Sequence, residues 1–232
     1  MNYLVIGGSS GIGLALVNKL AEAGHQVWSA SRQKGEIPAT ANFIELDVTA
    51  DQNQLKEQIP EVLDGLAYCP GTINLKPFLR LTEADFLADF KINVLGAVKT
   101  IQTCIPALKK SESASILMFS TVAVQTGMNF HSSIAASKGA IEGLTKSLAA
   151  EFAASKIRVN TLAPSLTDTP LAHNLVSTPE KREASDKRHP LGRIGTSTEL
   201  AEAAHFLLSP NSSWITGQIL GIDGGMSSVR TL

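Results

Sequence analysis

A glycine-rich turn near the N-terminus has the residue types and spacing that bind a phosphate group. Gly7, Gly11 and Gly13 follow the pattern G-x3-G-x-G, with Ser9 and Ser10 between them. Glycine adopts the backbone conformations that so tight a turn requires, and its missing side chain lets an anion approach the backbone closely. A helix beginning at this turn would direct free N–H groups and the positive end of its dipole at the anion. The turn therefore predicts a pyrophosphate site for a dinucleotide.

The residues after the second apolar segment indicate which dinucleotide is bound. Sites for NAD usually carry an Asp or Glu there, which accepts a hydrogen bond from the ribose 2′-hydroxyl. This chain has Ser31 and Arg32 instead. A guanidinium group binds a 2′-phosphate through paired charged hydrogen bonds, and the Ser31 hydroxyl would add a donor. We expect NADP(H) as the cofactor; the alternative is that Arg32 is only a solvated surface residue.

The elements that must position these residues alternate between strand-like and helix-like segments. Apolar periodicity predicts a first helix that Gly24 ends, and the stretch 31–41 is too short for more than a loop or a single turn. Repeated strand–helix units with short connections favour a doubly wound parallel sheet of seven strands, with helices on both faces. The expected strands are 3–6, 27–30, 42–46, 65–68, 115–119, 157–163 and 218–222, and the later helices are 51–59, 83–108, 134–154 and 198–208, the last opened by Ser197 or Thr198.

Length and composition limit the protein class. The chain has 232 residues, 44% of them hydrophobic and 18% charged, with a net charge of −1. These values predict one globular domain over 1–232, without the basic excess of a nucleic-acid-binding protein. We expect no membrane span, because no apolar run approaches about 20 residues. The first strand begins at the N-terminus and two cysteines form no disulfide framework, so we expect a cytoplasmic protein. No metal-ligand spacing occurs, so we expect no structural metal.

The motifs together resemble those of the short-chain dehydrogenase/reductase family, in its single-domain form. The resemblance covers essentially the whole chain and implies a Rossmann-like fold. It rests on the glycine turn and on five further segments: Leu46-Asp47-Val48, Lys91-Ile92-Asn93-Val94, Ser137-Lys138, Arg158-Val159-Asn160-Thr161-Leu162-Ala163-Pro164, and the tail from Arg193 through Ile215-Thr216-Gly217 to Ile222-Asp223-Gly224-Gly225.

The resemblance also implies roles for single residues. Asp47 and Val48 would contact the adenine, and Lys138 would hydrogen-bond the nicotinamide ribose. Asn93 would hold a water that links Lys138 to solvent, and Thr169 would lie near the pyrophosphate or the carboxamide. The full expected cofactor set is Gly7, Ser9, Ser10, Gly11, Ile12, Gly13, Ser31, Arg32, Asp47, Val48, Gly71, Asn93, Lys138, Pro164, Thr167 and Thr169.

The expected catalytic centre departs from the family pattern. The family's acid–base tyrosine lies four residues before the lysine, and that position is Ile134 here. The only tyrosines are Tyr3 and Tyr68, which lie far from it in the sequence. The family's serine corresponds to Thr121, which keeps a hydroxyl. General acid–base help is worth about 10²–10⁴-fold, and isoleucine supplies none of it.

Three smaller departures accompany the missing tyrosine. The threonine before the first glycine is Ile6, and the glycine after Pro164 is Ser165. The loop after the fourth strand reads Tyr68-Cys69-Pro70-Gly71 and keeps only the glycine. Cys69 is interpreted as a small packed residue rather than a redox-sensing thiol, and Cys104 as packing.

Three interpretations of the missing tyrosine remain open. In the first, the chain is an NADP(H)-dependent oxidoreductase acting on a carbonyl, enone or imine, and His131 supplies the proton, since it lies seven residues before Lys138. Ser132, Ser133 or a bound water could replace His131, which would then be a loop or cap residue. In the second, the chain is a non-catalytic NADP(H)-binding sensor or scaffold. In the third, solvent supplies the proton.

Two further features bear on substrate and assembly. The irregular stretch 165–193 would form either a mobile lid over the substrate or a solvated loop, and Met128, Phe130 and Ile134 would give the pocket an apolar wall. The helical stretches 83–108 and 134–154 pair across a dimer axis in the family. The resemblance therefore implies a homodimer or homotetramer, although the same small apolar residues would also suit a monomer core.

Overall fold

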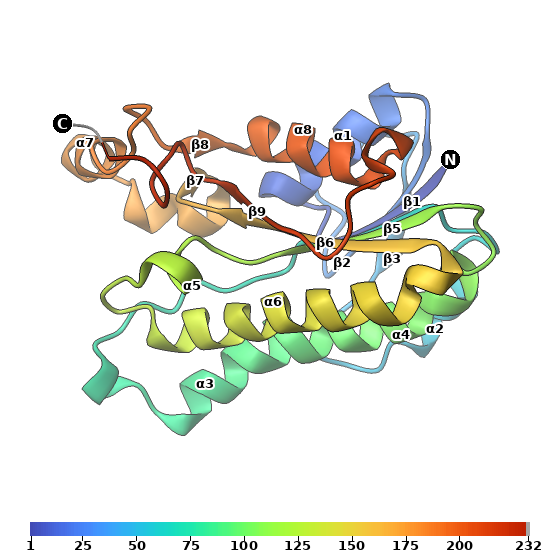
Figure 1. The fold of residues 1–232 in the computed structure, drawn as a ribbon, viewed down its shortest axis with the longest axis horizontal. Coiled ribbons are helices and arrows are strands. Elements are labelled where there is room, and N and C mark those ends of the chain that lie inside the picture. Colours follow the sequence, from blue (N-terminus) through green and yellow to red (C-terminus); the bar gives the residue numbers. More distant parts are fainter. Residues whose placement is uncertain (231–232) are drawn as a thin grey trace.

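A computed structural model describes residues 1–230 as a parallel sheet between two layers of helices (Figure 1). The strand order is β3-β2-β1-β4-β5-β6-β9, and every neighbouring pair is parallel, which confirms the expected doubly wound sheet. The strands are β1 (Asn2–Ile6), β2 (Gln26–Ser31), β3 (Asn42–Glu45), β4 (Gly65–Tyr68), β5 (Ala114–Phe119), β6 (Ile157–Pro164) and β9 (Ile219–Ile222).

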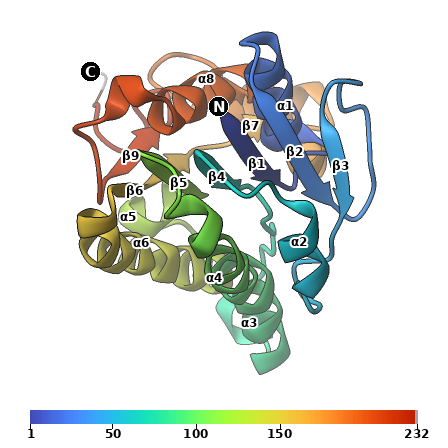
Figure 2. The ribbon, with the colours of Figure 1, turned by 90° about the vertical axis from the view of Figure 1, so that its right-hand side faces the viewer.

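The helices divide between the two faces of the sheet, and each layer buries its own apolar cluster (Figures 1 and 2). Strands β1, β4, β5 and β6 are almost wholly buried, as a parallel sheet covered on both sides requires. One face carries α1 (Gly11–Glu22) and α8 (Ser197–Leu208); the other carries α2 (Asn53–Gln58), α3 (Glu83–Phe90), α4 (Gly96–Leu108) and α6 (Ser132–Phe152).

The strand order reverses beside β1, which fixes where a ligand can bind. From β1 the chain winds outward through β2 to β3 and then returns to β4 on the other side. In open parallel sheets, ligands occupy the crevice outside the carboxyl ends of the strands at such a reversal. The glycine turn leaves the carboxyl end of β1 at this point.

The expected helix 83–108 is divided by a π-helical turn. Residues Lys91–Leu95 form this turn between α3 and α4, without a break in the helical path. A π-turn inserts one extra residue into the helix and rotates the following side chains, and such turns are frequent at functional sites. Asn93 lies in this turn, so the irregularity accompanies a predicted site residue.

Several other boundaries differ from the sequence expectations. The α8 cap is Thr196, one residue before Ser197, because its hydroxyl accepts from the backbone of Glu199 while the Glu199 carboxylate accepts from Thr196. Stretch 165–193, expected as a mobile lid or a solvated loop, contains regular elements. It contains β7 (Thr167–Asp168), a 3₁₀ segment at Pro170–Leu175 and α7 (Pro179–Asp186), and β7 pairs with β8 (Gly195–Thr196).

Candidate cofactor and catalytic site

The glycine turn connects β1 to α1 as the sequence predicts. Gly7 and Gly11 have φ values of 76° and 53°, in the left-handed region that favours glycine. Ser10 caps α1 with extended backbone, and its side chain makes no cap hydrogen bond. The first N–H groups of α1 therefore keep their capacity to bind an anion.

Gly13 is required for close contact between α1 and the turn. A β-carbon at this position would lie 2.2 Å from the carbonyl oxygen of Gly7. We expect Gly13→Ala to lower the free energy of unfolding by about 1–3 kcal/mol, in the range of overpacked core sites, and to weaken NADPH binding. Urea unfolding and an NADPH titration measure the two effects.

The matched control is Gly143→Ala on α6, where a β-carbon meets nothing within 4 Å. Alanine is the better helix former, so this variant should be at least as stable as the wild type. Wild-type stability and NADPH affinity in Gly13→Ala would contradict the assigned role of the turn.

The predicted adenosine end gathers at the carboxyl edge of β2 and β3. Ser31 is buried and donates to the carbonyl oxygen of Gln33, whereas the Arg32 side chain is exposed and has no ion-pair partner among residues 1–230. Asp47 accepts two hydrogen bonds from Thr49, and these, followed by the charges of Arg32 and Lys91, lower the pKa of its carboxyl. Lys91 is thus a second nearby cation, which sequence reasoning did not select.

The structure brings the segment after β6 against the glycine turn. A β-carbon on Gly11 would lie 3.4 Å from the Thr169 side chain. Pro164, Thr167 and Thr169 line a cavity together with Ile12. Residues about 160 positions apart in the sequence therefore meet at the expected cofactor edge.

This cavity has a volume of about 300 Å³ and mostly apolar walls. It lies next to the predicted catalytic residues, and Met128 and Ile134 form part of the wall as expected. Phe130 does not: it is 54% exposed and lies outside the lining. Lining side chains with polar groups are Cys69, Thr72, Ser120, Thr121, His131, Lys138, Ser165, Thr167, Thr169 and Arg188.

Lys138 lies on the buried floor of the cavity. Its ammonium group donates to the carbonyl oxygen of Phe119 at 2.8 Å. Burial lowers its pKa to about 8, although the charges of Cys69 and Asp89 act in the opposite direction. The amine therefore titrates close to neutral pH in the protein without cofactor.

The lowered pKa predicts a pH dependence of stability. Lys138 has a pKa of about 8 in the folded protein, against the ordinary lysine value of 10.5 in an unfolded chain, so the unfolded chain binds more protons between these limits. Stability from this residue therefore rises as the pH rises through that window. The measurement is the free energy of unfolding of the wild type and of Lys138→Met in urea titrations. We expect the wild-type value minus the variant value to increase from pH 7.5 to pH 10. A constant or falling difference would contradict the buried, destabilised ammonium.

Asn93 is held so that its carbonyl oxygen has no partner. The amide nitrogen donates to the backbone oxygen of Asp89 at 2.8 Å and to the Thr72 hydroxyl at 3.0 Å. The buried Oδ1 atom makes no hydrogen bond within the described chain. A β-carbon on Gly71 would lie 3.4 Å from both Asn93 Oδ1 and Lys138 Nζ, so both atoms border the space at Gly71. An orphaned acceptor next to a buried amine fits the expected water link.

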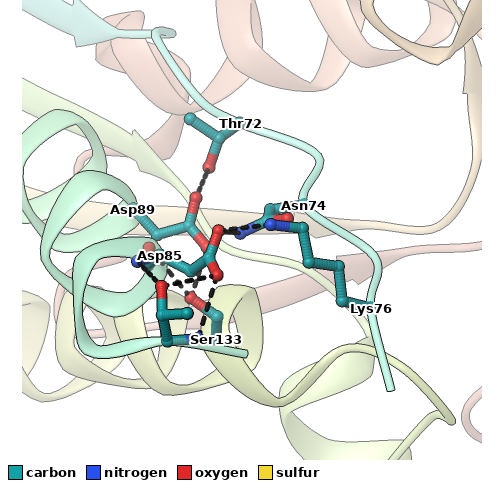
Figure 3. Close-up of polar contacts among 7 residues, drawn as sticks. Thr72, Asn74, Lys76, Asp85, Asp89 and Ser133 are labelled. Carbon is teal, nitrogen blue, oxygen red and sulfur yellow. Dashed lines mark hydrogen bonds and ion pairs between the residues drawn. The ribbon is translucent and has the colours of Figure 1, made fainter. Parts of the chain in front are cut away.

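A buried carboxylate fixes this arrangement (Figure 3). Asp89 accepts from the Thr72 hydroxyl at 2.6 Å and from the Ser133 hydroxyl at 2.5 Å. It thereby joins α3, the loop after β4 and the start of α6, the three segments that surround Asn93. The sequence signal for Asp89 was its position four residues before Asn93, which places both on one helix face.

The remaining predicted catalytic residues also border the cavity. The Thr121 hydroxyl oxygen accepts from the backbone N–H of Ala123 at 3.3 Å, so its proton remains available to a ligand. His131 is the N-cap residue of α6, and its Nδ1 lies 2.7 Å from the carbonyl oxygen of Asn129. That contact leaves Nε2 as the nitrogen that can meet a substrate.

The two tyrosines and two cysteines are packed in the protein interior. Tyr3 and Tyr68 are buried within the two apolar clusters, and neither lines the cavity. Burial raises the pKa of the Cys69 and Cys104 thiols to about 12, which opposes a reactive thiolate at either position. Ile134 contributes only apolar surface to the cavity.

Comparison with known proteins places this geometry in a family. Residues 7–227 match the family described as Enoyl-(Acyl carrier protein) reductase. A tropinone reductase homologue of Arabidopsis thaliana is 32% identical over 98% of this chain and 93% of its own length. The 3-oxoacyl-[acyl-carrier-protein] reductase FabG of Thermotoga maritima is 34% identical, with 96% of each chain covered.

Solved structures agree over the whole fold. A short chain dehydrogenase family protein from Francisella tularensis superposes with a TM-score of 0.90 at 31% identity, over 98% of this chain and 99% of the other. A 3-ketoacyl-(acyl-carrier-protein) reductase from Brucella melitensis complexed with NADH has a TM-score of 0.90 at 28% identity, over 97% and 98%. ElxO with NADP bound has a TM-score of 0.90 at 26% identity, over 98% and 99%. Among residues 1–230, no helix is both long and apolar enough to cross a membrane. The chain belongs to the short-chain dehydrogenase/reductase family and is of the oxidoreductase type.

Proposed function

We propose that the protein is an NADP(H)-dependent oxidoreductase that acts on the C=O, C=C or C=N bond of a small, largely apolar molecule. One observation carries this proposal: Lys138 Nζ and the orphaned Asn93 Oδ1 border the same space at Gly71, beside an apolar cavity. Two of the neighbouring structures contain a nicotinamide cofactor, NADH in one and NADP in the other, which supports a nicotinamide cofactor here. Arg32 at the end of β2 is exposed and has no ion-pair partner within the described residues, which favours NADP(H).

The chain's own residues would bind and orient the cofactor along the carboxyl edge of the sheet. The α1 N-terminus would bind the pyrophosphate, Arg32 with Ser31 the 2′-phosphate, and Lys138 the nicotinamide ribose. When bound, the nicotinamide supplies or accepts a hydride. The apolar cavity walls would exclude water from the reacting bond.

The proton must come from a group other than a tyrosine. Neither tyrosine lines the cavity, and Ile134 carries no proton. His131 is the candidate that the sequence selected, and the structure leaves its Nε2 free to act. A His131→Ala protein that keeps full NADPH-dependent turnover would remove His131 from the proton route.

The test of the proposed function is NADPH consumption with a panel of ketones, enones and imines, followed by nicotinamide absorbance. We expect consumption with at least one class, and loss of turnover in Lys138→Ala. Ile134 in the family's tyrosine position favours one alternative, a non-catalytic NADP(H)-binding sensor or scaffold. Tight NADPH binding without consumption across the panel would support that alternative.

The exposed face of the α3–α4 helical stretch supports a homodimer or homotetramer. Leu87, Phe90 and Leu95 are between 39% and 60% exposed there, although they are large apolar residues. Burying such surface against a second copy would be favourable. Light scattering should give a dimer or a tetramer, and a monomer at all concentrations would contradict this.

A further inference from the structure

A serine–histidine pair on the cavity wall has no role in the cofactor site. Ser165 follows directly after β6, and its hydroxyl oxygen lies 2.8 Å from Nε2 of His189. Nδ1 of the same imidazole lies 2.8 Å from the carbonyl oxygen of Ser185. Ser165 is half-buried and lines the cavity shared by Lys138 and Thr121, whereas the His189 side chain behind it is only 4% exposed.

The contacts of His189 define which protons it can move. A backbone carbonyl only accepts, so Nδ1 must carry a proton in every protonation state. Nε2 is therefore the nitrogen that gains or loses a proton, and it contacts the Ser165 hydroxyl. This is the geometry of a hydroxyl coupled to an imidazole that a third group orients.

A carboxylate lies near His189. Asp223 lies close enough for the two charges to interact. Burial raises the pKa of Asp223, but hydrogen bonds from Ser227 and Gly225 and the His189 charge lower it by more, so the carboxylate stays ionised. The other charged groups on that side, Arg193 and Glu199, are paired with each other.

We propose that Ser165 delivers the proton to the substrate and that His189 replaces it, which fills the place of the missing tyrosine. This proposal rests on the proposed oxidoreductase function and names the proton donor of that same site. Ser165 would be the catalytic residue, because it borders the cavity; its hydroxyl donates to Met226 Sδ on the same wall at 3.1 Å and would turn to a bound substrate. His189 acts through Ser165 as a positioning and relay residue. A serine hydroxyl alone is a poor acid, so Ser165 needs His189 to replace the proton that it gives up.

The proton step balances with the hydride step. In reduction of a C=O bond, the substrate carbon would receive the hydride that a bound reduced nicotinamide would supply. The Ser165 O–H bond breaks as a new O–H bond forms on the substrate oxygen, and the Nε2–H bond of the His189 imidazolium breaks as its proton moves to Ser165 Oγ. His189 becomes neutral and regains a proton from solvent after the product leaves. In the direction of oxidation each transfer runs in reverse.

The direct test removes each half of the pair and measures kcat and KM with the most active compound of the panel. We expect Ser165→Ala and His189→Gln each to lower kcat by about 10²-fold, the low end of general acid–base effects, with little change in KM or NADPH affinity. The double variant should fall no lower than Ser165→Ala, because the two residues act through one proton. The matched controls are Ser213→Ala and His173→Gln, which change the same residue types at exposed positions outside the cavity.

A second measurement tests the contact between Ser165 and His189 independently of the proposed oxidoreductase function. ¹⁵N NMR of the imidazoles should show His189 protonated at Nδ1 and its Nε2 signal changed by Ser165→Ala. If the wild type is active and Ser165→Ala or His189→Gln has the same kcat, the relay is overturned and the proposed oxidoreductase function is not affected. No turnover in the wild type would instead defeat the proposed function. An Nε2 signal insensitive to Ser165→Ala would overturn the pairing itself.

Discussion

Replacing Arg32 with alanine is expected to lower the affinity for NADPH by about 10- to 100-fold and to leave the affinity for NADH unchanged. Charged hydrogen bonds are worth about 1.5–3 kcal/mol each when one is lost, which sets this range. Arg32 is exposed, follows β2 and has no acidic partner in the described chain, so its guanidinium is available to a phosphate. Calorimetric titration with both nucleotides measures the two affinities.

The control for this prediction is Lys34→Ala, which removes a neighbouring exposed cation from the same loop. A general loss of positive potential would weaken NADPH binding in both variants, whereas a specific 2′-phosphate contact affects Arg32→Ala alone. Equal losses for NADPH and NADH in Arg32→Ala would contradict the assigned cofactor preference. Cofactor choice would then depend on other groups, of which Lys91 is the nearest candidate.

Introducing a tyrosine at position 134 of the Ser165→Ala protein is expected to restore ketone reduction by about 10²-fold or more, since general acid catalysis spans about 10²–10⁴-fold. Ile134 borders the cavity of about 300 Å³, so a phenol has space on that side. Lys138 lies one helical turn further along α6, where it can stabilise the phenolate as the family pattern implies. The measurement is steady-state kcat for two proteins, Ser165→Ala alone and Ser165→Ala combined with Ile134→Tyr. The restoration is the ratio of the second kcat to the first.

Ile134→Phe in the same background separates chemistry from packing. Phenylalanine adds the ring without the hydroxyl, so it should leave the Ser165→Ala rate low. Restoration by phenylalanine as well as tyrosine would show that cavity shape, rather than proton donation, limits the rate. Failure of both would mean that position 134 does not reach the reacting bond.

The regular part of the fold could be predicted from the sequence because buried parallel strands are short apolar runs. The segments at 3–6 and 65–68 match β1 and β4 closely, since each is bounded by glycine or polar residues. The π-turn at Lys91–Leu95 could not be predicted, because its residues remain compatible with an ordinary helix. The structure of 165–193 also depends on tertiary contacts, such as the pairing of β7 with β8.

The candidate site divides in the same way. The glycine turn could be recognised from its spacing and Lys138 through the family resemblance, and the structure brings both to one edge of the sheet. The role of Asp89 could not, because its hydrogen-bond partners Thr72 and Ser133 come from distant segments, and its spacing from Asn93 alone does not show that the carboxylate is buried. The contact between Ser165 and His189 spans 24 residues. The sequence showed Ser165 only as a departure from a glycine.

The account's central claim is that the chain transfers a hydride to a substrate, and isotope transfer tests it most directly. NADPH deuterated at C4 of the nicotinamide, on one face and then on the other, is incubated with the protein and the most active compound of the panel. The account predicts deuterium in the product from one of the two labelled cofactors and loss of that transfer in Lys138→Ala. Absence of deuterium from the product with both cofactors, while NADPH binds, would contradict it.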